Sequence, residues 1–191
     1  MAITPLLGRS VLGAFGWKTI GAPPEGCPKY VLVAAPHTSN WDFPFTLATF
    51  MKFGVKLHWV GKHTLFKGPF GWLPRALGGI AVDRRSAHNM VQTLADRFAA
   101  ADHLVVAVAV EGSRKRHEYW KSGFYHIARA ANVPVVLGAL DFAKKEATLG
   151  PAIHLTGNMK ADMDRIRAFY AGRVGKNPEW FGPVRLKDEE G

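Results

Sequence analysis

Cysteine is almost absent from this sequence, since Cys27 is the only one among its 191 residues. A single thiol excludes an internal disulfide and a zinc cluster built on cysteines, and it suits a reducing cytoplasm. No apolar run approaches the roughly 18 residues that a membrane-spanning helix needs. The N-terminus also lacks the pattern of a secretory signal. These absences predict a cytoplasmic protein that does not span a bilayer.

Acidic residues are also scarce, because 15 Asp and Glu stand against 25 Lys and Arg, for a formal net charge of +10. Such a charge attracts polyanions: nucleic acid, anionic lipid or phosphorylated metabolites. Nucleic acid is the less favoured partner, since no helix-turn-helix, zinc finger or aromatic stacking motif accompanies the charge. Aromatic residues make up 12% of the chain. Basic and aromatic side chains together favour an anionic membrane surface.

The chain has the composition of a folded protein. Hydrophobic residues make up 48% of it, which argues against disorder. Its length predicts one domain over residues 1–191 with a sizeable core. Residues 1–29 are expected to form a short N-terminal helix, with Leu7 and Leu12 on one face, and a connector rich in Gly and Pro. That helix lies either at a membrane surface or against the core.

Strand and helix patterns alternate along the rest of the chain. We expect strands at 30–35, 56–60, 80–82, 104–110 and 133–142, and helices at 43–53, 87–101, 122–131 and 162–174. A turn at 144–146 returns the last of these strands into another at 147–155. This alternation predicts an α/β fold: a layered, mostly parallel sheet flanked by helices.

The most informative motif follows the first of these strands. Residues 35–42 read Ala-Pro-His-Thr-Ser-Asn-Trp-Asp and place His37 close to Asp42. A neutral histidine can take a proton from a hydroxyl, and a neighbouring carboxylate can hold its tautomer and stabilise the imidazolium. The pair therefore predicts a general base at the end of a buried strand.

Three further segments carry candidate chemistry. Residues 78–85 end in Arg84 and Arg85, whose guanidinium groups match phosphate or carboxylate oxygens. Residues 110–114, Val-Glu-Gly-Ser-Arg, follow the most apolar strand, and ligands of open α/β sheets bind beyond the carboxyl ends of strands. Residues 132–136 open a strand with a proline. Taken singly, these segments also fit a surface ion pair with Asp83, a polar turn and an ordinary strand start.

In order and approximate spacing, the four segments resemble the blocks of the glycerolipid acyltransferase family, of the lysophosphatidic acid acyltransferase type. The family's blocks read H-x4-D, G-x-[IV]-x-[VI]-[DK]-R, E-G-[ST]-R and V-P-[IV]-[VI]. The stretches 61–73 and 121–124 also resemble family segments, so that the likeness covers roughly residues 30–140. Pro36 departs from the family's usual Asn or Ser, and Arg85 adds a second arginine. The resemblance implies a glycerol-3-phosphate acyltransferase-like fold.

The resemblance also implies a reaction and a set of roles. A fatty acyl group would pass from a thioester donor, acyl-CoA or acyl carrier protein, to a hydroxyl of a lysophospholipid-type acceptor such as 1-acylglycerol-3-phosphate. His37 would act as general base and Asp42 as its orienting partner, with no bound cofactor and no metal. Arg84 would bind the acceptor's phosphate. The substrate-binding residues it implies are Gly79, Arg84, Arg85, Glu111, Gly112, Ser113, Arg114 and Pro134.

The stretch 66–72, rich in Phe and Trp, is a candidate lining for the acyl chain. The enzyme would work in the cytoplasm, peripherally associated with the membrane.

Other readings compete with this one. Ser113 or Cys27 would serve a covalent acyl-enzyme route, although Ser113 lacks the second glycine of a nucleophile elbow. His58 and His63 would form a metal site with His37, but no set of carboxylates accompanies them. The alternative from a different class is a non-catalytic basic protein that binds anionic lipid or nucleic acid.

Overall fold

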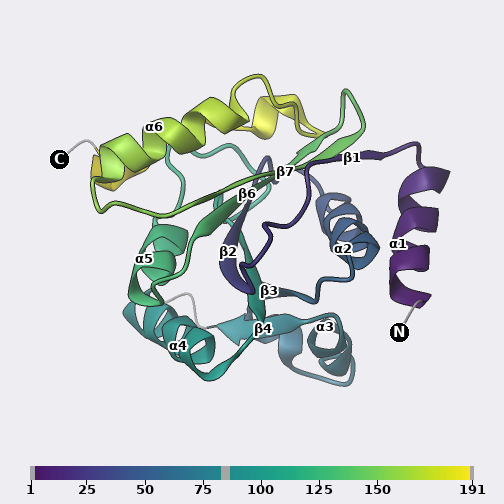
Figure 1. Ribbon diagram of the computed structural model, residues 1–191, viewed down its shortest axis with the longest axis horizontal. Coiled ribbons are helices and arrows are strands. Elements are labelled where there is room, and N and C mark those ends of the chain that lie inside the picture. The colour runs from purple at the N-terminus through teal and green to yellow at the C-terminus, as the bar shows by residue number, and fades with distance from the viewer. Residues whose placement is uncertain (1–2, 83–86, 190–191) are drawn as a thin grey trace.

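The computed structural model describes residues 3–82 and 87–189, and there the strands form one sheet in the order β1-β7-β6-β2-β5-β3-β4 (Figure 1). Neighbouring strands are parallel except for β6 and β7. The predicted α/β fold with a mostly parallel sheet is therefore confirmed. The strands are β1 (Lys18–Ile20), β2 (Lys29–Ala34), β3 (Leu57–Lys62), β4 (Gly79–Val82), β5 (Leu104–Ala109), β6 (Val135–Asp141) and β7 (Glu146–Ile153).

Helices cover both faces of this sheet. In Figure 1, α4, α5 and α6 lie on one side, while α2 lies on the other with α1 outside it. The helices are α1 (Ile3–Ala14), α2 (Asp42–Lys52), α3 (Trp72–Ala76), α4 (Ala87–Ala100), α5 (Gly123–Ala130) and α6 (Met159–Tyr170). The described residues also form the 3-10 turns η1 (His63–Phe66), between β3 and α3, and η2 (Pro178–Trp180) and η3 (Lys187–Glu189), after α6.

Strand β2 shows why the central strands are apolar throughout. Val31 and Val33 belong to the core under α5 and α6, whereas Tyr30 and Leu32 belong to the core under α2. Successive side chains of a strand point to opposite faces. A strand that is covered on both faces therefore has no solvent-exposed face, and its residues are apolar throughout.

The strand register brings the segments after β2 and β5 to one edge. Lys29 to Ala34 of β2 pair with Leu104 to Ala109 of β5, residue by residue. Both strands therefore end together, and the residues that follow them, His37 and Glu111, leave the sheet at the same carboxyl edge.

Three elements differ from the sequence prediction. The prediction missed β1, which has only three residues and pairs with β7 at its edge. Helix α6 begins at Met159 rather than 162, because the Asn158 side chain caps it by accepting a hydrogen bond from the Ala161 N–H at 3.1 Å. Helix α3 lies within a segment rich in Gly and Pro, whose composition hides a helix of five residues.

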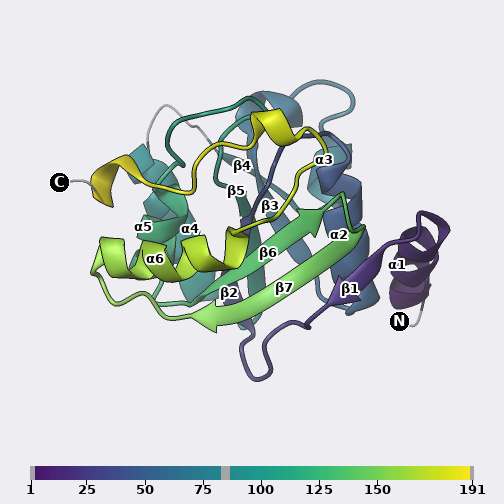
Figure 2. The same ribbon diagram turned by 90° about the horizontal axis from the view of Figure 1, so that it is seen from above.

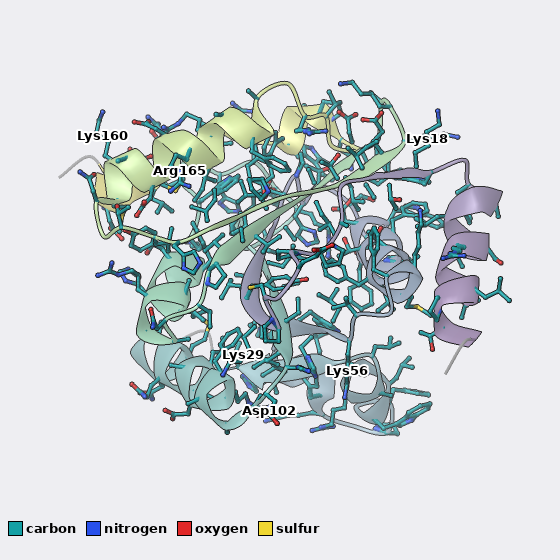
Figure 3. The ribbon with its side chains drawn as sticks, in the orientation of Figure 1. Lys18, Lys29, Lys56, Asp102, Lys160 and Arg165 are labelled. Atoms are coloured by element: carbon teal, nitrogen blue, oxygen red, sulfur yellow. The ribbon has the colours of Figure 1, made fainter. Side chains whose placement is uncertain are left out.

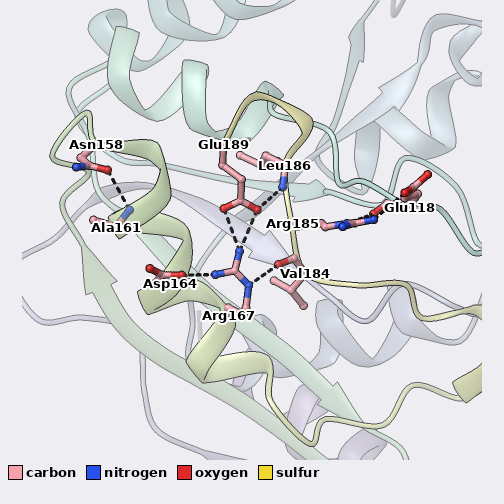
Figure 4. A network of polar contacts seen from close by, with 9 residues as sticks. All are labelled: Glu118, Asn158, Ala161, Asp164, Arg167, Val184, Arg185, Leu186 and Glu189. Carbon is pink, nitrogen blue, oxygen red and sulfur yellow. Dashed lines mark hydrogen bonds and ion pairs between the residues drawn. The ribbon is translucent and has the colours of Figure 1, made fainter. Parts of the chain in front are cut away.

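Residues 171–189, which we call the C-terminal strap, run back across the carboxyl edge of the sheet (Figure 2). The Arg167 side chain binds the strap through the Glu189 carboxylate at 2.9 Å and the Val184 carbonyl at 3.0 Å (Figure 4). Between these two contacts, the Trp120 N–H donates to the Arg185 carbonyl at 2.8 Å. The last part of the strap, residues 184–189, is thus held by a side chain and by backbone.

The N-terminal helix α1 packs on α2. Leu12 is buried between them, whereas Leu7 and Phe15 are about half exposed. A Cβ built on Gly8 would lie 2.4 Å from the Lys52 nitrogen and 2.5 Å from the Ala48 oxygen, so the two helix backbones approach closely there. The part of the chain that the structure describes holds no helix long and apolar enough to cross a membrane.

We predict opposite effects of alanine at the two glycines inside α1. Gly8→Ala should lower the free energy of unfolding by about 1–3 kcal/mol, because the new methyl group meets the α2 backbone. Gly13→Ala should raise it by about 0.5–1 kcal/mol, because a Cβ there meets nothing and alanine favours helix. Urea titration followed by circular dichroism measures both. Equal effects of the two changes would show that α1 and α2 are not closely packed.

Candidate active site

The His37–Asp42 pair is formed by the loop that leads from β2 into α2. Asp42 is the first residue of α2, where the helix dipole favours a negative charge. Its Oδ2 accepts a hydrogen bond from the Ser39 N–H at 2.9 Å and lies 3.1 Å from the His37 Nδ1. Asp42 is buried, and His37 is partly exposed. The carboxylate thus holds one ring nitrogen and leaves the other, Nε2, without a partner among the residues described.

Glu111 fixes the same loop from the neighbouring strand. Its Oε1 accepts a hydrogen bond of 2.5 Å from the His37 N–H, and the residue is only 2% exposed. The pKa of Glu111 is raised to about 7, mainly by burial and also by the charge of Asp42, against the hydrogen bond and the charge of His37, which lower it. The sequence predicted substrate binding for Glu111, but its observed contact is with the backbone of His37.

The C-terminal strap supports the loop from a third side. The Asn177 side-chain amide donates to the Thr38 carbonyl at 2.7 Å, and the Asn177 N–H donates to the Thr38 hydroxyl at 3.2 Å. Gly175 packs so closely that a Cβ there would lie 2.6 Å from the Thr38 hydroxyl oxygen. Sequence reasoning missed both residues, since no motif surrounds them and they lie far along the chain.

An apolar cavity of about 270 Å³ extends from the His37–Asp42 pair between α2 and the sheet. Its sheet wall has small residues, which include Ala34, Ala107, Ala109 and Gly138. Its helix wall includes Phe43, Thr46, Thr49 and Phe50, and deeper lining residues include Leu32, Leu57 and Leu149. The ionisable residues of its described lining are His37, Asp42 and Arg114. This is a concave, mostly apolar site with a few convergent polar groups, as small-molecule sites usually are.

The turn after β5 places the other residues of the third block. Gly112 has a φ of +75°, a conformation that glycine adopts without strain. The Ser113 hydroxyl lies 2.6 Å from the His117 Nε2 and accepts from the Lys115 N–H at 3.3 Å. Arg114 lines the cavity, and no described acidic side chain is paired with it. The turn therefore brings one cation to the site.

The structure does not bring Pro134 to this site. Val31 at the start of β2 pairs with Val135, so Pro134 lies at the amino edge of the sheet, and the Val31 N–H bonds to its carbonyl at 3.0 Å. His37 lies beyond the other end of β2, roughly 20 Å away at about 3.3 Å per residue. A proline that opens β6 is the reading that the structure supports.

Two further expectations have different outcomes. Gly79 is packed closely, since a Cβ there would meet the Pro74 oxygen at 2.6 Å and the Phe66 ring at 2.7 Å, and its role in substrate binding stays a prediction. The stretch 66–72 does not line the cavity, since Phe66 is buried beside Gly79 while Phe70 and Trp72 are exposed. Arg84 and Arg85 lie outside the described residues.

Cys27 and the three histidines are not placed as the competing chemistries require, whereas the route through Ser113, whose hydroxyl lies 2.6 Å from the His117 Nε2, stays a prediction. Cys27 lies before β2 at the amino edge, its thiol donates to the Lys29 carbonyl at 3.4 Å, and burial raises its pKa. A buried thiol with a raised pKa is a poor nucleophile. Among residues 3–82 and 87–189, no three His, Cys, Asp or Glu side chains are grouped as metal ligands, so His37, His58 and His63 do not form a metal site.

Comparison with known proteins agrees with this geometry. Residues 24–137 match the protein family described as Acyltransferase, and the chain therefore belongs to the Acyltransferase family. Among solved structures it is similar to the 1-acyl-sn-glycerophosphate (LPA) acyltransferase, PlsC, from Thermotoga maritima. The TM-score is 0.56 and the identity 16%, over 91% of this chain and 80% of that one. A likeness at this identity establishes the fold. A comparison with curated proteins found no match.

We predict that Glu111→Gln removes a pH dependence of stability. The pKa of Glu111 rises from 4.5 to about 7 on folding, so between these values the folded state keeps a proton that the unfolded state releases. The free energy of unfolding of the wild type should therefore fall, by up to about 3 kcal/mol, as the pH rises through that window.

Glutamine keeps an Oε1 that accepts from His37 but cannot ionise, so the fall should disappear in this variant. Urea titrations from pH 4 to 8 measure it, with Glu25→Gln on the surface as the control that keeps the wild-type slope. Parallel profiles for the wild type and Glu111→Gln would contradict the assignment.

Proposed function

We propose that this chain is an O-acyltransferase. It moves a fatty acyl group from a thioester donor, acyl-CoA or acyl carrier protein, to a hydroxyl of a lysophospholipid-type acceptor such as 1-acylglycerol-3-phosphate. The observation that carries the proposal is the His37–Asp42 pair at the lining of an apolar cavity. The family supports acyl transfer, and the activity of the structurally similar Thermotoga maritima protein supports the choice of acceptor. The proposal treats residues 1–191 as one acyltransferase domain.

The His37 ring acts as general base in this proposal. Asp42 holds the proton on Nδ1, so Nε2 has a free lone pair. Nε2 removes the proton of the acceptor hydroxyl as its oxygen attacks the thioester carbonyl carbon. The carbon–sulfur bond of the resulting tetrahedral intermediate then breaks, and the imidazolium returns the proton to the departing thiolate. The products are an ester and a free thiol, and the mechanism uses no bound metal or cofactor.

The cavity holds the fatty acyl chain. Each methylene group that leaves water for such a cavity contributes about 0.8 kcal/mol. The small sheet residues Ala107 and Gly138 leave room that larger side chains would fill. Since the cavity lining includes His37, a chain inside it would place its thioester beside the base.

The acceptor is held by cationic groups. Arg114 lines the cavity near the base, and the proposal keeps Arg84 and Arg85 as further anion-binding residues. Gly112 and Ser113 shape the turn that presents Arg114. Acyl chains and lysophospholipids reside in bilayers, so the enzyme is proposed to work in the cytoplasm, peripherally attached to an anionic membrane.

We predict that His37→Ala lowers kcat by about 10²–10⁴-fold, because the general base is lost. Asp42→Asn should also lower kcat strongly, since the amide does not stabilise the imidazolium. Thiol release from acyl-CoA, with 1-acylglycerol-3-phosphate as acceptor, measures both.

The matched control is His154→Ala, at an exposed histidine away from the cavity, and circular dichroism checks folding. A folded His37→Ala protein with near wild-type turnover would remove His37 as the base. Binding of anionic vesicles without any thiol release by the wild type would favour the non-catalytic alternative.

We predict that Ala107→Leu changes the preferred chain length. Ala107 lies one pleat deeper in the cavity than Ala109, which is at the end of β5. A leucine there fills the deep part of the cavity and leaves the part beside His37 open. The ratio of kcat/KM for hexadecanoyl-CoA to that for octanoyl-CoA should fall at least tenfold. An equal loss for both donors would show that the chain lies elsewhere.

A further inference from the structure

The segment from η1 to α3 exposes large apolar side chains. Leu65 is 55% exposed, Phe70 76%, Trp72 63% and Leu73 46%. We call these four residues the apolar lip. Single exposed hydrophobic residues are ordinary, whereas several within one short segment mark an interaction site.

The lip is held outward by a buried anchor beneath it. Phe66 is 4% exposed and packs against Trp59, with ring centroids 5.9 Å apart. The Arg75 side chain donates to the Gly71 carbonyl at 2.7 Å and lies over the Phe66 ring at 5.6 Å. A Cβ on Gly71 would lie 2.3 Å from the Phe66 oxygen, so the turn between the two apolar groups is tight. The exposed side chains are therefore presented by a packed scaffold.

The charges around the lip have one sign. Residues 43–82 contain no Asp or Glu, and Lys62, Lys67 and Arg75 are exposed beside the lip. Basic residues alone would not single out this face, because Lys18 on β1 and Lys160 on α6 also project into solvent (Figure 3). Exposed Phe and Trp beside lysines that pair with no described carboxylate are typical of surfaces that insert at the headgroup level of anionic bilayers.

The lip adjoins the mouth of the cavity. Segment η1 follows the carboxyl end of β3, and α3 leads from there back to the start of β4 (Figure 2). Leu65 belongs both to the lip and to the cavity lining. An apolar surface thus runs from solvent into the site of the His37–Asp42 pair.

We infer that the apolar lip docks on an anionic phospholipid bilayer, with Phe70 and Trp72 inserted and Lys62 and Lys67 on the headgroups. Docking places the cavity mouth at the lipid, so that the chain passes from bilayer to cavity without crossing water. The inference deepens the proposed function. Only the passage of the acyl chain rests on that function, because docking on the bilayer is measured as binding, without turnover.

The test is co-sedimentation of the full chain with vesicles of equal parts phosphatidylglycerol and phosphatidylcholine. The double variant F70S/W72S should lower the partition coefficient at least tenfold, whereas Trp180→Ser, which removes an exposed tryptophan on η2, should not. The double variant K62E/K67E should lower the partition coefficient about fivefold for each lysine on these anionic vesicles. It should leave the partition coefficient on vesicles of phosphatidylcholine alone unchanged. Equal binding of the wild type and F70S/W72S would overturn the inference, as would absence of wild-type binding.

A second set of measurements separates other occupants and the reaction itself. If the wild type is a dimer by light scattering and F70S/W72S is a monomer, the lip is an interface between two copies and the inference fails. Octanoyl-CoA with a soluble short-chain acceptor should be turned over equally by the wild type and F70S/W72S, while a vesicle-embedded acceptor should not. If the wild type does not turn over octanoyl-CoA with the soluble acceptor, the proposed function is contradicted, while the result of the vesicle-binding experiment still stands. Equal turnover of the embedded acceptor counts against the lip.

Discussion

The hydrogen bond from the His37 N–H to the Glu111 side chain connects the two strand ends on which the site depends. Parallel pairing of β2 with β5 already brings both residues to one edge, but a loop beyond a strand is free to move unless it is bound. A buried carboxyl at 2.5 Å from the backbone supplies that bond. Burial of the same carboxyl opposes its ionisation and outweighs the hydrogen bond from His37, so the group that binds this loop also makes folding sensitive to pH.

The two faces of the sheet are packed differently. Under α5 and α6, the faces of β2 and β5 present Val31, Val33 and Val106, which are fully buried in one hydrophobic core. Under α2, the same strands present Ala34 and Ala107 at their carboxyl halves. Protein interiors are otherwise close-packed, so small residues opposite a helix of Phe and Thr leave space that surrounding atoms do not reach. One sheet thus provides a rigid core on one face and a binding cavity on the other.

Contacts within one short stretch of sequence could be predicted, whereas contacts between distant segments could not. The His37–Asp42 contact was predictable because both residues lie in one short loop, whose strand and helix are each strongly apolar. The position of Asn177 was not, because its contact with Thr38 depends on how the strap returns over the sheet. Pro134 was misplaced because a motif gives sequence order and says nothing of which edge of the sheet a residue occupies.

The lining of the cavity shows the same limit. Phe66, Phe70 and Trp72 have the composition of an acyl-binding wall, yet the tight turn at Gly71 sends Phe66 inward and leaves Phe70 and Trp72 in solvent. The residues that do line it on the sheet, Ala107 and Gly138, are inconspicuous in sequence because small residues occur in every buried strand. What identifies them is their register opposite α2.

The return of the strap over the loop of His37 has a consequence for biosynthesis. The partner of Thr38 in this loop is Asn177, which the ribosome adds 139 residues later. At about 5–20 residues per second, the interval between the two is on the order of 10 s. During that interval the nascent protein carries His37 on a loop that lacks one of its supports, and the loop reaches its final form only after Asn177 has been added.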